Sequence, residues 1–538
     1  MTDTPYDPEV PQTGLVHWYL ERWAAEQPTA SAYSYEPVAM ADGDATDGTW
    51  KELNREAARL AASLSEAGVE PGDYVATLFP QCPQYLRTYA AAAKLGATLV
   101  PIDLRSEPRE IKYVLEQTQP TAFLGVDAYH GESYRDALTG HDLLADISIV
   151  EWLDDTGFVS DGDPGEYEWS VVDSDGSTRK SADAVGNHDP DTPFLVVFTS
   201  GTTGSPKGAL LSHRNTVFQG TAMSDTWAID QSDTTLVHLP PSHVGGSTEL
   251  LGTVFVSGGE AVLLDAFDPG EVLGRIGTES ITVVGNVPAM WEMLFTVPDH
   301  EDAMESVKTA VVAGQAPSEN CLDGMAAIGT PVTGWGLTET GGFVTLTELE
   351  ASWDKLTETV GKPYAGFDVK AVDASGSTLS EGEIGELVVR GDGVMVGYLD
   401  DEQTAAETID EEWIRTGDMG FVDEDGYVRL RGRAHNMYIS GGYNVYPDEI
   451  QDVLTSHPAV NLAQVVGIEH EKWGEAGHAF IVPDPDADLD VSDLEEYAGK
   501  ELADYKRPVK YTISDELPTT PLGKIDRQGL IERYDLSI

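Results

Sequence analysis

The sequence predicts an α/β protein, with a large N-terminal region of βαβ-type sheets followed by a β-rich part and a small α+β region. Apolar runs alternate with helical patterns over most of the chain. Short strands joined by turn signals follow from about residue 366 to 432, and a helix with two strands is expected after residue 433. Since single cores stop growing at roughly 250–300 residues, we expect two domains in 538 residues, 1–432 and 433–538.

The first βαβ unit is predicted between residues 49 and 103. Residues 49–68 carry apolar residues at helical spacing and end at Gly68, a typical helix C-cap. Residues 73–80 then read as a strand, 84–97 as a helix and 98–103 as a strand, the order expected in a parallel sheet. The segment from about 128 to 192 is rich in Asp, Gly and Ser, and we expect an irregular excursion there.

The second set of elements begins with a strand at 194–200, followed by a Gly/Thr/Ser loop and a helix predicted over 210–223. The runs AVLLDAF, ITVVGNVP and KTAVVAGQ favour further strands of the same kind. After residue 366, VDEDGYVRLRG contains an Asp-Gly hairpin signal. NVYPDEIQDVLTSHP then predicts a helix, and LAQVVGI and HAFIVP predict strands of the last region.

The charge is unusual, because 93 acidic residues face 32 lysines and arginines, for a net charge of -61. The acids are scattered through patterned sequence rather than gathered in a tail. Such self-repulsion destabilises a compact state, and at molar salt, where the Debye length is about 3 Å, most of it disappears. We therefore hypothesise a halophilic enzyme adapted to molar intracellular salt, against the alternative of an acidic surface without special meaning. The charge argues against nucleic acid or an anionic membrane as partner.

The compartment is predicted to be cytoplasmic. Cys82 and Cys321 are too few for a disulfide framework. No run approaches the 18 or so apolar residues of a membrane span, so no integral membrane contact is expected. The start, MTDTPYDPEV, has neither a basic nor an apolar signal region.

The sharpest local pattern is FTSGTTGSPKGALLSHRN (198–215), which predicts a phosphate-binding loop. Its glycines let backbone N–H groups approach an anion, and Lys207 adds a positive charge suited to a polyphosphate. The pattern is not a Walker loop, since Pro206 precedes Lys207 and Gly208 follows it. The candidate nucleotide contacts of this loop are Thr199, Ser200, Gly201, Thr202, Thr203, Gly204 and Lys207.

TSGTTGSPKG resembles the signature of the adenylate-forming superfamily of acyl- and aryl-CoA synthetases, non-ribosomal peptide adenylation domains and luciferases. GWGLTET (334–340), GELVVRGDGVMVGY (385–398), RTGDMGFVDEDGY (415–427), GRAHNMYISGGYNVYPDEI (432–450) and PLGKIDR (521–527) resemble its further motifs, in order. The closest resemblance is to AMP-forming acyl-CoA synthetases. It implies ATP, Mg²⁺ and coenzyme A as ligands, a barrel-like β-rich part and a mobile C-terminal domain.

The resemblance also assigns roles within the first domain. Thr338 would contact the α-phosphate and Glu339 would bind Mg²⁺, which prefers oxygen ligands. Trp335, beside Gly336, would lie on the adenine, or would be a core tryptophan. Asp418 would accept hydrogen bonds from the ribose, and Arg433 would fix ribose or phosphate near the domain junction. Gly314, Gln315 and Ala316 resemble the turn that lines the adenine and acyl pocket.

In the C-terminal region, the resemblance makes Lys524 the catalytic lysine of the first half-reaction, bridging carboxylate and α-phosphate. Domain rotation would then bring Gly441 and Gly442 to the site for the thioester step. The hinge position holds His435, where the family usually has Asp or Lys. This departure puts the energetics of rotation in doubt, and a solvated surface histidine is the plainer interpretation.

The substrate is predicted from LPPSHVGGSTELLG (239–252), which resembles the pocket segment of acyl- and aryl-CoA synthetases. His243 would border the substrate carboxylate, unless it is a structural histidine. No acidic residue of this segment obviously awaits an amino group, so we expect a medium- or long-chain fatty acid, with aryl acids as the alternative. EKWGEAGHA and the absence of a carrier domain favour CoA as acceptor over a carrier protein. A non-catalytic nucleotide-binding protein is disfavoured because Glu339 and Lys524 are both present, and a P-loop ATPase lacks its motif.

Overall fold

The computed structural model describes residues 14–40, 45–154, 157–160, 188–199, 206–399, 409–410, 413–433, 436–440, 443–470, 473–484, 487, 489–519, 525–534 and 536. Over these residues the α/β fold predicted from the sequence is confirmed, with two large, mostly parallel sheets, an antiparallel sheet and a separate C-terminal sheet. Of the helices in these ranges, none is both long and apolar enough to cross a membrane.

One large sheet is built from the first predicted βαβ unit and the phosphate-loop strands. Its order is β21 (Gly397–Tyr398), β11 (Lys207–Ser212), β10 (Pro193–Thr199), β4 (Thr98–Pro101), β3 (Tyr74–Leu78), β5 (Ala122–Val126), β8 (Ile149–Asp154) and β9 (Gly157–Ser160). Strands β10, β4, β3, β5 and β8 run parallel, whereas β11 turns back against β10.

The other large sheet carries the candidate nucleotide motifs. Its order is β18 (Lys362–Pro363), β17 (Gly342–Leu346), β16 (Thr330–Leu337), β15 (Thr309–Val312), β14 (Val283–Asn286), β12 (Thr234–Val237), β13 (Glu260–Leu263), β1 (Ser31–Tyr35) and β2 (Thr46–Thr49). Strands β16, β15, β14, β12, β13 and β1 are parallel, and β17 pairs antiparallel with the end of β16.

Helices between these sheets form the main core. They are α1 (Val16–Glu26), α2 (Trp50–Ala67), α3 (Pro83–Leu95), α6 (His213–Trp227) and α7 (Leu251–Ser257). One apolar cluster joins their side chains to strands of both sheets. Helix α2 shows how local sequence sets its ends, since Thr49 and Glu52 form a capping box and Gly68 closes it at φ 115°.

The outer faces of both sheets are covered as well. Against the β16 sheet pack α8 (Pro269–Glu279), α9 (Pro288–Phe295), α11 (Glu319–Ile328) and α12 (Trp353–Glu358), with α10 (His300–Ala303) beside α8. Against the β10 sheet pack α4 (Pro108–Thr118) and α5 (Tyr134–Gly140), next to the small hairpin β6 (Ala128–Tyr129) and β7 (Glu132–Ser133).

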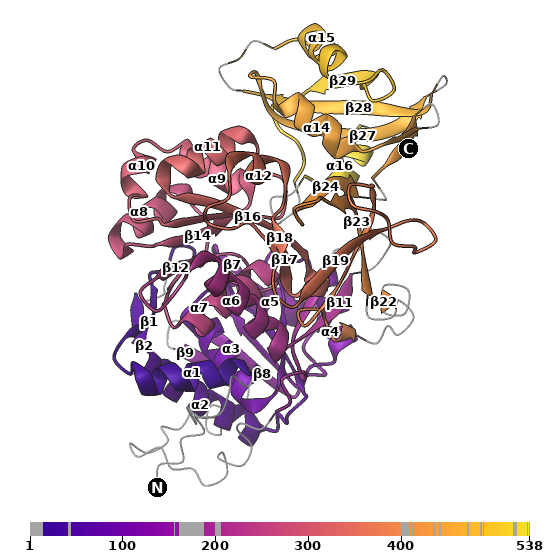
Figure 1. The fold of residues 1–538 in the computed structure, drawn as a ribbon. Coiled ribbons are helices and arrows are strands. Elements are labelled where there is room, and N and C mark those ends of the chain that lie inside the picture. Colours follow the sequence, from indigo (N-terminus) through magenta and orange to yellow (C-terminus); the bar gives the residue numbers. More distant parts are fainter. Residues whose placement is uncertain are drawn as a thin grey trace.

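The β-rich part is a curled antiparallel sheet, as predicted. It contains β19 (Phe367–Val372), β20 (Gly385–Gly391), β23 (Trp413–Val422) and β22 (Ile409–Asp410), with β24 (Val428–Arg433) on β23. The Asp-Gly signal forms the turn between β23 and β24. In Figure 1 this sheet lies between the body and the C-terminal unit.

The C-terminal unit has its own core. Strands β25 (Tyr438–Ser440), β26 (Tyr443–Val445), β27 (Val460–His470), β28 (Gly474–Pro483) and β29 (Lys510–Ile513) form its sheet, and its helices are α14 (Pro447–Thr455), α15 (Val491–Glu501) and α16 (Arg527–Arg533). Its apolar clusters share no residue with those of the body. The domain limit at residues 432 and 433 remains a prediction, and Arg433 is the last residue of β24.

Two sequence expectations differ from the structure. Residues 210–212 were expected to be helical but belong to β11, because their apolar side chains complete the antiparallel pair with β10; α6 begins only after the capping residue Ser212. The segment 128–192 was expected to be irregular, yet β8 within it is paired with β5. Its IVEWLD sequence supplies a buried Trp152 to the core of that sheet.

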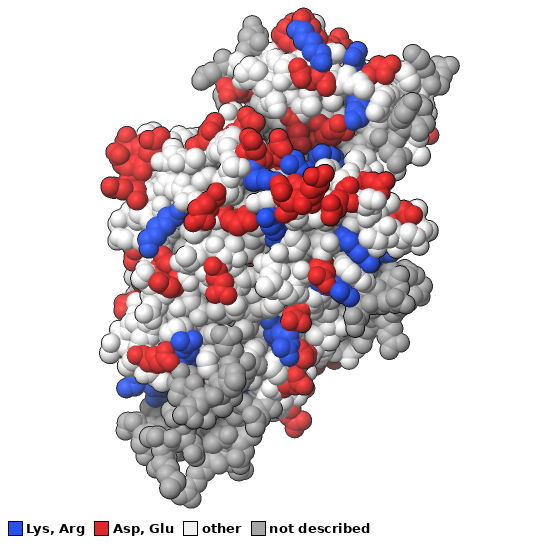
Figure 2. Space-filling view, in the orientation of Figure 1, with Lys and Arg blue, Asp and Glu red and all other residues white. Residues whose placement is uncertain are grey.

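Figure 2 shows how the charge is distributed on one face. Asp and Glu are spread from the body to the C-terminal unit, with fewer Lys and Arg among them. The largest mixed group lies near the middle of the view, below the C-terminal unit. On this face the acids are thus spread over the surface rather than gathered in one acidic patch.

Candidate functional site

The candidate residues of the first domain gather at the carboxyl ends of parallel strands. The segment containing His243 follows β12, the Gly314 turn follows β15, and Trp335 to Glu339 occupy the end of β16 and the turn after it. In open α/β sheets this edge is where ligands bind. Gly314, Gln315 and Ala316 are exposed there, and Gly314 has a φ of 85°, which glycine adopts without strain.

The predicted phosphate loop is held by the β10–β11 hairpin. Thr199 and Lys207 are paired across its open end, and the Thr199 hydroxyl donates to the Lys207 carbonyl at 3.3 Å. Ser200, Gly201, Thr202, Thr203 and Gly204 lie outside the described residues. The hairpin therefore fixes where the loop leaves and rejoins the sheet.

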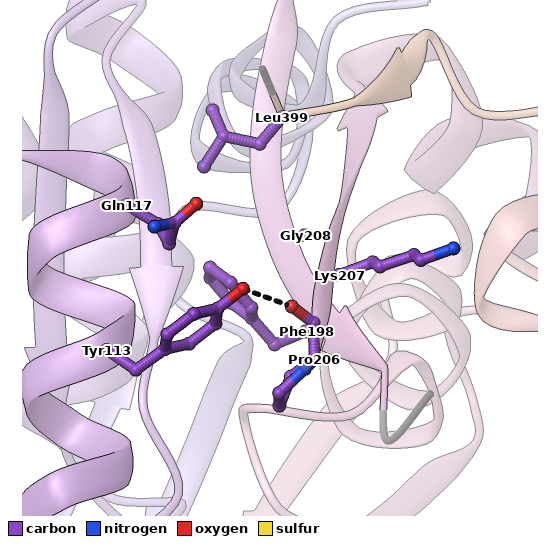
Figure 3. Close-up of a pocket in the computed structure, with 7 residues that line it drawn as sticks. All are labelled: Tyr113, Gln117, Phe198, Pro206, Lys207, Gly208 and Leu399. Atoms are coloured by element: carbon purple, nitrogen blue, oxygen red, sulfur yellow. Dashed lines mark hydrogen bonds between the residues drawn. The ribbon is translucent and has the colours of Figure 1, made fainter. Parts of the chain in front are cut away.

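A cavity of about 210 Å³ lies behind this hairpin, between α4 and β11. It is lined by Tyr113, Gln117, Phe198, Pro206, Lys207, Gly208 and Leu399. The Tyr113 hydroxyl donates to the Pro206 carbonyl at 2.9 Å, whereas the Lys207 side chain extends away from Tyr113 and Gln117 (Figure 3). The ammonium group of Lys207 thus faces away from this cavity.

Lys207, Glu339 and Tyr398 form one group. The Tyr398 hydroxyl donates to Glu339 Oε1 at 2.7 Å, and the Lys207 ammonium lies 5.7 Å from the centroid of the Tyr398 ring. The backbone N–H of Met395 donates to the Glu339 carbonyl at 2.8 Å. Tyr398 was missed among the candidates although it ends the quoted motif GELVVRGDGVMVGY. Its pairing with Ala209 on β11 gave no signal in the sequence.

The structure joins Trp335 directly to Asp418. Trp335 Nε1 donates to Asp418 Oδ2 at 2.8 Å, and both side chains are about 6% exposed. Trp335 belongs to an apolar cluster with Val344 and Phe367. The backbone of Asp418 is paired with that of Arg433 in the β23–β24 ladder.

Tight packing surrounds this motif. A Cβ on Gly336 would lie 1.9 Å from the Gly342 carbonyl oxygen, so only glycine fits there. Thr338 begins the 3₁₀ turn η2 (Thr338–Thr340), and its carbonyl accepts from Gly341 N. The turn presents Thr338 and Glu339 next to each other at the end of β16.

His243 is half-buried after β12. Its Nδ1 accepts from Gly245 N at 3.0 Å, so a backbone donor fixes the ring orientation and tautomer. Its carbonyl accepts from Gly246 N and Ser247 N, which starts the π-helix η1 (Gly245–Leu250). One acid of this turn, Glu249, which no sequence motif indicated, lies against Gly245 and Gly342.

The remaining candidates are not described. Lys524, Gly441, Gly442 and His435 lie outside the described residues, and of Arg433 only the backbone is described. Their roles therefore stay predictions from the motifs.

The residues present fit Mg²⁺. Protein sites for this ion use one or two carboxylates together with substrate phosphates, rather than a full protein cage. Glu339 supplies such a carboxylate, oriented by Tyr398. No group of three or more His, Cys, Asp or Glu within the described part of the chain could hold a metal by itself.

Comparisons with known proteins show which family the chain belongs to. The AMP-binding enzyme family model matches residues 20–399, and the AMP-binding enzyme C-terminal domain model matches 449–524. A feruloyl-CoA synthase from Amycolatopsis sp is 31% identical, covering 97% of this chain and 99% of its own. The fatty acid–[acyl-carrier-protein] ligase ScoC from Streptomyces coeruleorubidus is 32% identical over 93% of each chain.

A solved structure is similar along nearly the whole chain. The o-succinylbenzoate CoA synthetase MenE from Bacillus subtilis, in complex with its acyl-adenylate intermediate, has a TM-score of 0.77 and 26% identity. The similarity covers 95% of this chain and 97% of MenE. The chain therefore belongs to the AMP-binding enzyme family, as an acid–thiol ligase of the acyl-CoA synthetase type.

Proposed function

We propose that the protein is an AMP-forming carboxylic acid:CoA ligase whose active site lies at the carboxyl edge of the β16 sheet. The observation that carries this proposal is the meeting of Lys207, Glu339 and Tyr398 beside the Trp335–Asp418 pair. Adenylation of an acid requires a cation for the phosphates, a carboxylate for the metal ion and polar groups for the nucleotide, and these residue types lie at one edge of the sheet.

The reaction has two steps. A carboxylate oxygen of the acid attacks the α-phosphorus of ATP, forming an acyl–phosphate bond while the bond to pyrophosphate breaks. The thiol sulfur of CoA then attacks the acyl carbon, forming the thioester while the bond to AMP breaks and the thiol proton is lost. Phosphoryl transfer of this kind depends mainly on positioning and on neutralising charge.

The residues take the roles that the motifs predict. Lys207 and the loop 199–204 bind the β- and γ-phosphates, Thr338 the α-phosphate, and Asp418 with Arg433 the ribose. Glu339 would hold Mg²⁺, which neutralises phosphate charge when bound. Lys524 bridges the carboxylate and the α-phosphate in the first step, and Gly441 with Gly442 serves the second. His243 lies where it would border the substrate carboxylate.

The acid is predicted to be a medium- or long-chain fatty acid, which would connect the enzyme to fatty acid metabolism, or an aryl acid. The similar proteins support both classes, since one activates ferulate and another a fatty acid. We predict that CoA accepts the acyl group and that the reaction takes place in the cytoplasm. The similarity to ScoC favours a second candidate, a ligase that loads an acyl-carrier protein.

The test follows AMP and pyrophosphate in high KCl with MgATP, CoA and a panel of fatty and aryl acids. Lys524→Ala should abolish acid-dependent pyrophosphate release, whereas Lys510→Ala, an exposed lysine on β29, should leave it unchanged. Release of ADP would overturn the mechanism. Acyl-adenylate that accumulates despite CoA, and is discharged by a carrier protein, would favour the second candidate.

A further inference from the structure

Tyr113 of α4 contacts the β10–β11 hairpin at two points, one on each side of Lys207. Its hydroxyl donates to the carbonyl of Pro206 at 2.9 Å, and Pro206 immediately precedes Lys207 (Figure 3). Its ring meets the Phe198 ring edge to face, with 6.4 Å between the two centroids. Phe198 is paired with Gly208, the residue after Lys207. Two contacts of one side chain therefore bracket the lysine that is predicted to bind the β- and γ-phosphates.

The bond to the Pro206 carbonyl acts directly on the backbone of Lys207. That carbonyl and the Lys207 N–H belong to one planar peptide unit, so fixing the direction of the carbonyl also fixes that of the N–H. Since the proline ring already holds φ near about −65°, the rotation that remains at Pro206 is ψ, and the hydrogen bond restricts it. The Tyr113 hydroxyl therefore sets the direction in which the Lys207 side chain leaves the hairpin.

The ring contact acts on the other side of Lys207. A Cβ on Gly208 would lie 3.3 Å from Phe198 Cζ, so the missing side chain lets the phenyl ring pack on this backbone. The Leu399 N–H donates to the Gly208 carbonyl at 2.8 Å, next to β21, the other neighbour of β11. The backbone after Lys207 is thus held between Phe198 and Leu399, and Tyr113 supports Phe198 from the side of α4.

An opening beside these contacts gives the hydrogen bond its importance. The cavity of about 210 Å³ lies between α4 and the hairpin, with Tyr113 and Pro206 in its wall. Close packing among the described residues does not fill this gap, so the hydroxyl of Tyr113 bridges it. On the opposite side of the hairpin, the Lys207 ammonium lies 5.7 Å from the centroid of the Tyr398 ring, whose hydroxyl donates to Glu339. The backbone at Lys207 therefore connects Tyr113 with the candidate metal ligand.

We propose that Tyr113 is a positioning residue for ATP, which holds Lys207 in the conformation that binds the β- and γ-phosphates. Tyr113 acts through the backbone, because the Lys207 side chain extends away from it. The inference rests on the proposed function, which gives Lys207 its ligand, and adds a residue that no sequence motif indicated. With both contacts in place, the backbone of Lys207 is ordered before ATP binds. Without them, binding must order it, which costs affinity for the phosphates.

The experiment measures direct binding of MgATP, of pyrophosphate with Mg²⁺ and of AMP to the folded protein in high KCl. Tyr113→Phe keeps the ring and removes the hydroxyl. Since one hydrogen bond makes a modest net contribution, we expect the Kd values for ATP and pyrophosphate to rise about threefold to tenfold. The Kd for AMP should not change, because AMP lacks the β- and γ-phosphates. Tyr113→Leu, which also removes the ring contact with Phe198, should raise the Kd for ATP further.

A matched control and a double-mutant cycle test whether the effect passes through Lys207. The Tyr129 hydroxyl also donates to a backbone carbonyl, that of Asp265 at 2.6 Å, and Tyr129 is half-buried as Tyr113 is. Tyr129→Phe should leave all three Kd values unchanged. In a Lys207→Ala protein, the added change Tyr113→Phe should not raise the Kd for ATP again, because residues that act as a unit are not additive. A general loss of structure would instead weaken AMP and ATP alike.

The outcomes separate this inference from the proposed function, whose own test is the acid-dependent release of pyrophosphate by the wild-type enzyme. A Kd for ATP that is unchanged in Tyr113→Phe, an equal rise of the Kd for AMP, or the same rise in the Lys207→Ala background would overturn the inference alone. A folded wild-type protein that binds neither ATP nor pyrophosphate would overturn the proposed function and the inference together.

Discussion

Trp335 and Asp418, separated by 83 positions, share a hydrogen bond of 2.8 Å that joins the end of β16 to β23 of the curled sheet. The bond leaves the indole ring in an apolar cluster and orients one carboxylate oxygen of Asp418. The two predicted nucleotide contacts are therefore coupled, so a change at one should alter the other.

Trp335→Phe tests this coupling. The phenyl ring keeps most of the apolar contact, but Asp418 loses a buried donor, which typically costs about 1–3 kcal/mol. We expect lower stability and a KM for ATP raised several-fold. Trp291→Phe is the matched control, because Trp291 also donates to a buried acceptor, the Val311 carbonyl at 2.9 Å, in the cluster under α9. An equal effect of both variants on the KM would refute the coupling.

Tyr398→Phe is expected to weaken the use of Mg²⁺. Removing the hydroxyl takes a donor from Glu339, and hydrogen bonds to charged groups contribute about 1.5–3 kcal/mol. The concentration of Mg²⁺ at half-maximal pyrophosphate release should rise about tenfold, and the rate of release at saturating Mg²⁺ should change less. Tyr427→Phe, which breaks a similar bond to Glu348 at 3.2 Å, should leave this concentration unchanged. If the two variants behave alike, Tyr398 does not orient the carboxylate.

Much of the fold could be predicted because its signals are local. The capping box at Thr49 and the glycine cap at Gly68 each depend on only a few neighbouring residues. The boundaries of α2 could therefore be predicted from the sequence. The error at residues 210–212 has a tertiary cause, since the pairing of β11 with β10 overrides the helical pattern. Sequence spacing carries no information about such pairing.

Individual residues of the candidate site could be predicted from the motifs, but the contacts between them could not. Motifs indicated Trp335, Asp418 and Glu339 one by one, yet the Trp335–Asp418 bond and the Tyr398–Glu339 bond depend on how distant strands meet. Glu249 was overlooked because a regular helical turn gives no reason to direct it toward Gly342. The π-turn that places it there is a feature of packing against Gly341.

A buried histidine should make the protein sensitive to acid. His213 packs against His17 and His188, and burial, with a smaller effect of His188, lowers the pKa of His213 to about 3. The folded protein then keeps this imidazole neutral, while the unfolded chain takes a proton below about pH 6.5. Stability is lost as the pH falls from about 6.5 toward 3, by about 1.4 kcal/mol per pH unit from this residue.

His213→Gln should therefore flatten the fall of the unfolding free energy between pH 6.5 and 5, measured by urea titration. The quantity to compare is the slope of the unfolding free energy against pH, because losing the imidazole ring changes the stability at every pH. Replacing the exposed His141 by Gln should leave the slope as in the wild type. A slope unchanged in His213→Gln would show that the imidazole does not titrate as described.

The net charge of -61 leads to the last prediction, on salt. The acids are spread over the visible face in Figure 2, so their repulsion acts across the molecule and is relieved as the screening length shrinks from about 10 Å at 0.1 M salt to about 3 Å at 1 M. The urea midpoint should rise steeply as KCl increases to about 1 M and flatten beyond it. Sucrose separates screening from solvent exclusion, since it is excluded from protein surfaces but carries no charge. A midpoint that rises equally in sucrose, or does not respond to KCl, would exclude charge repulsion as the cause and with it the proposed adaptation to molar salt.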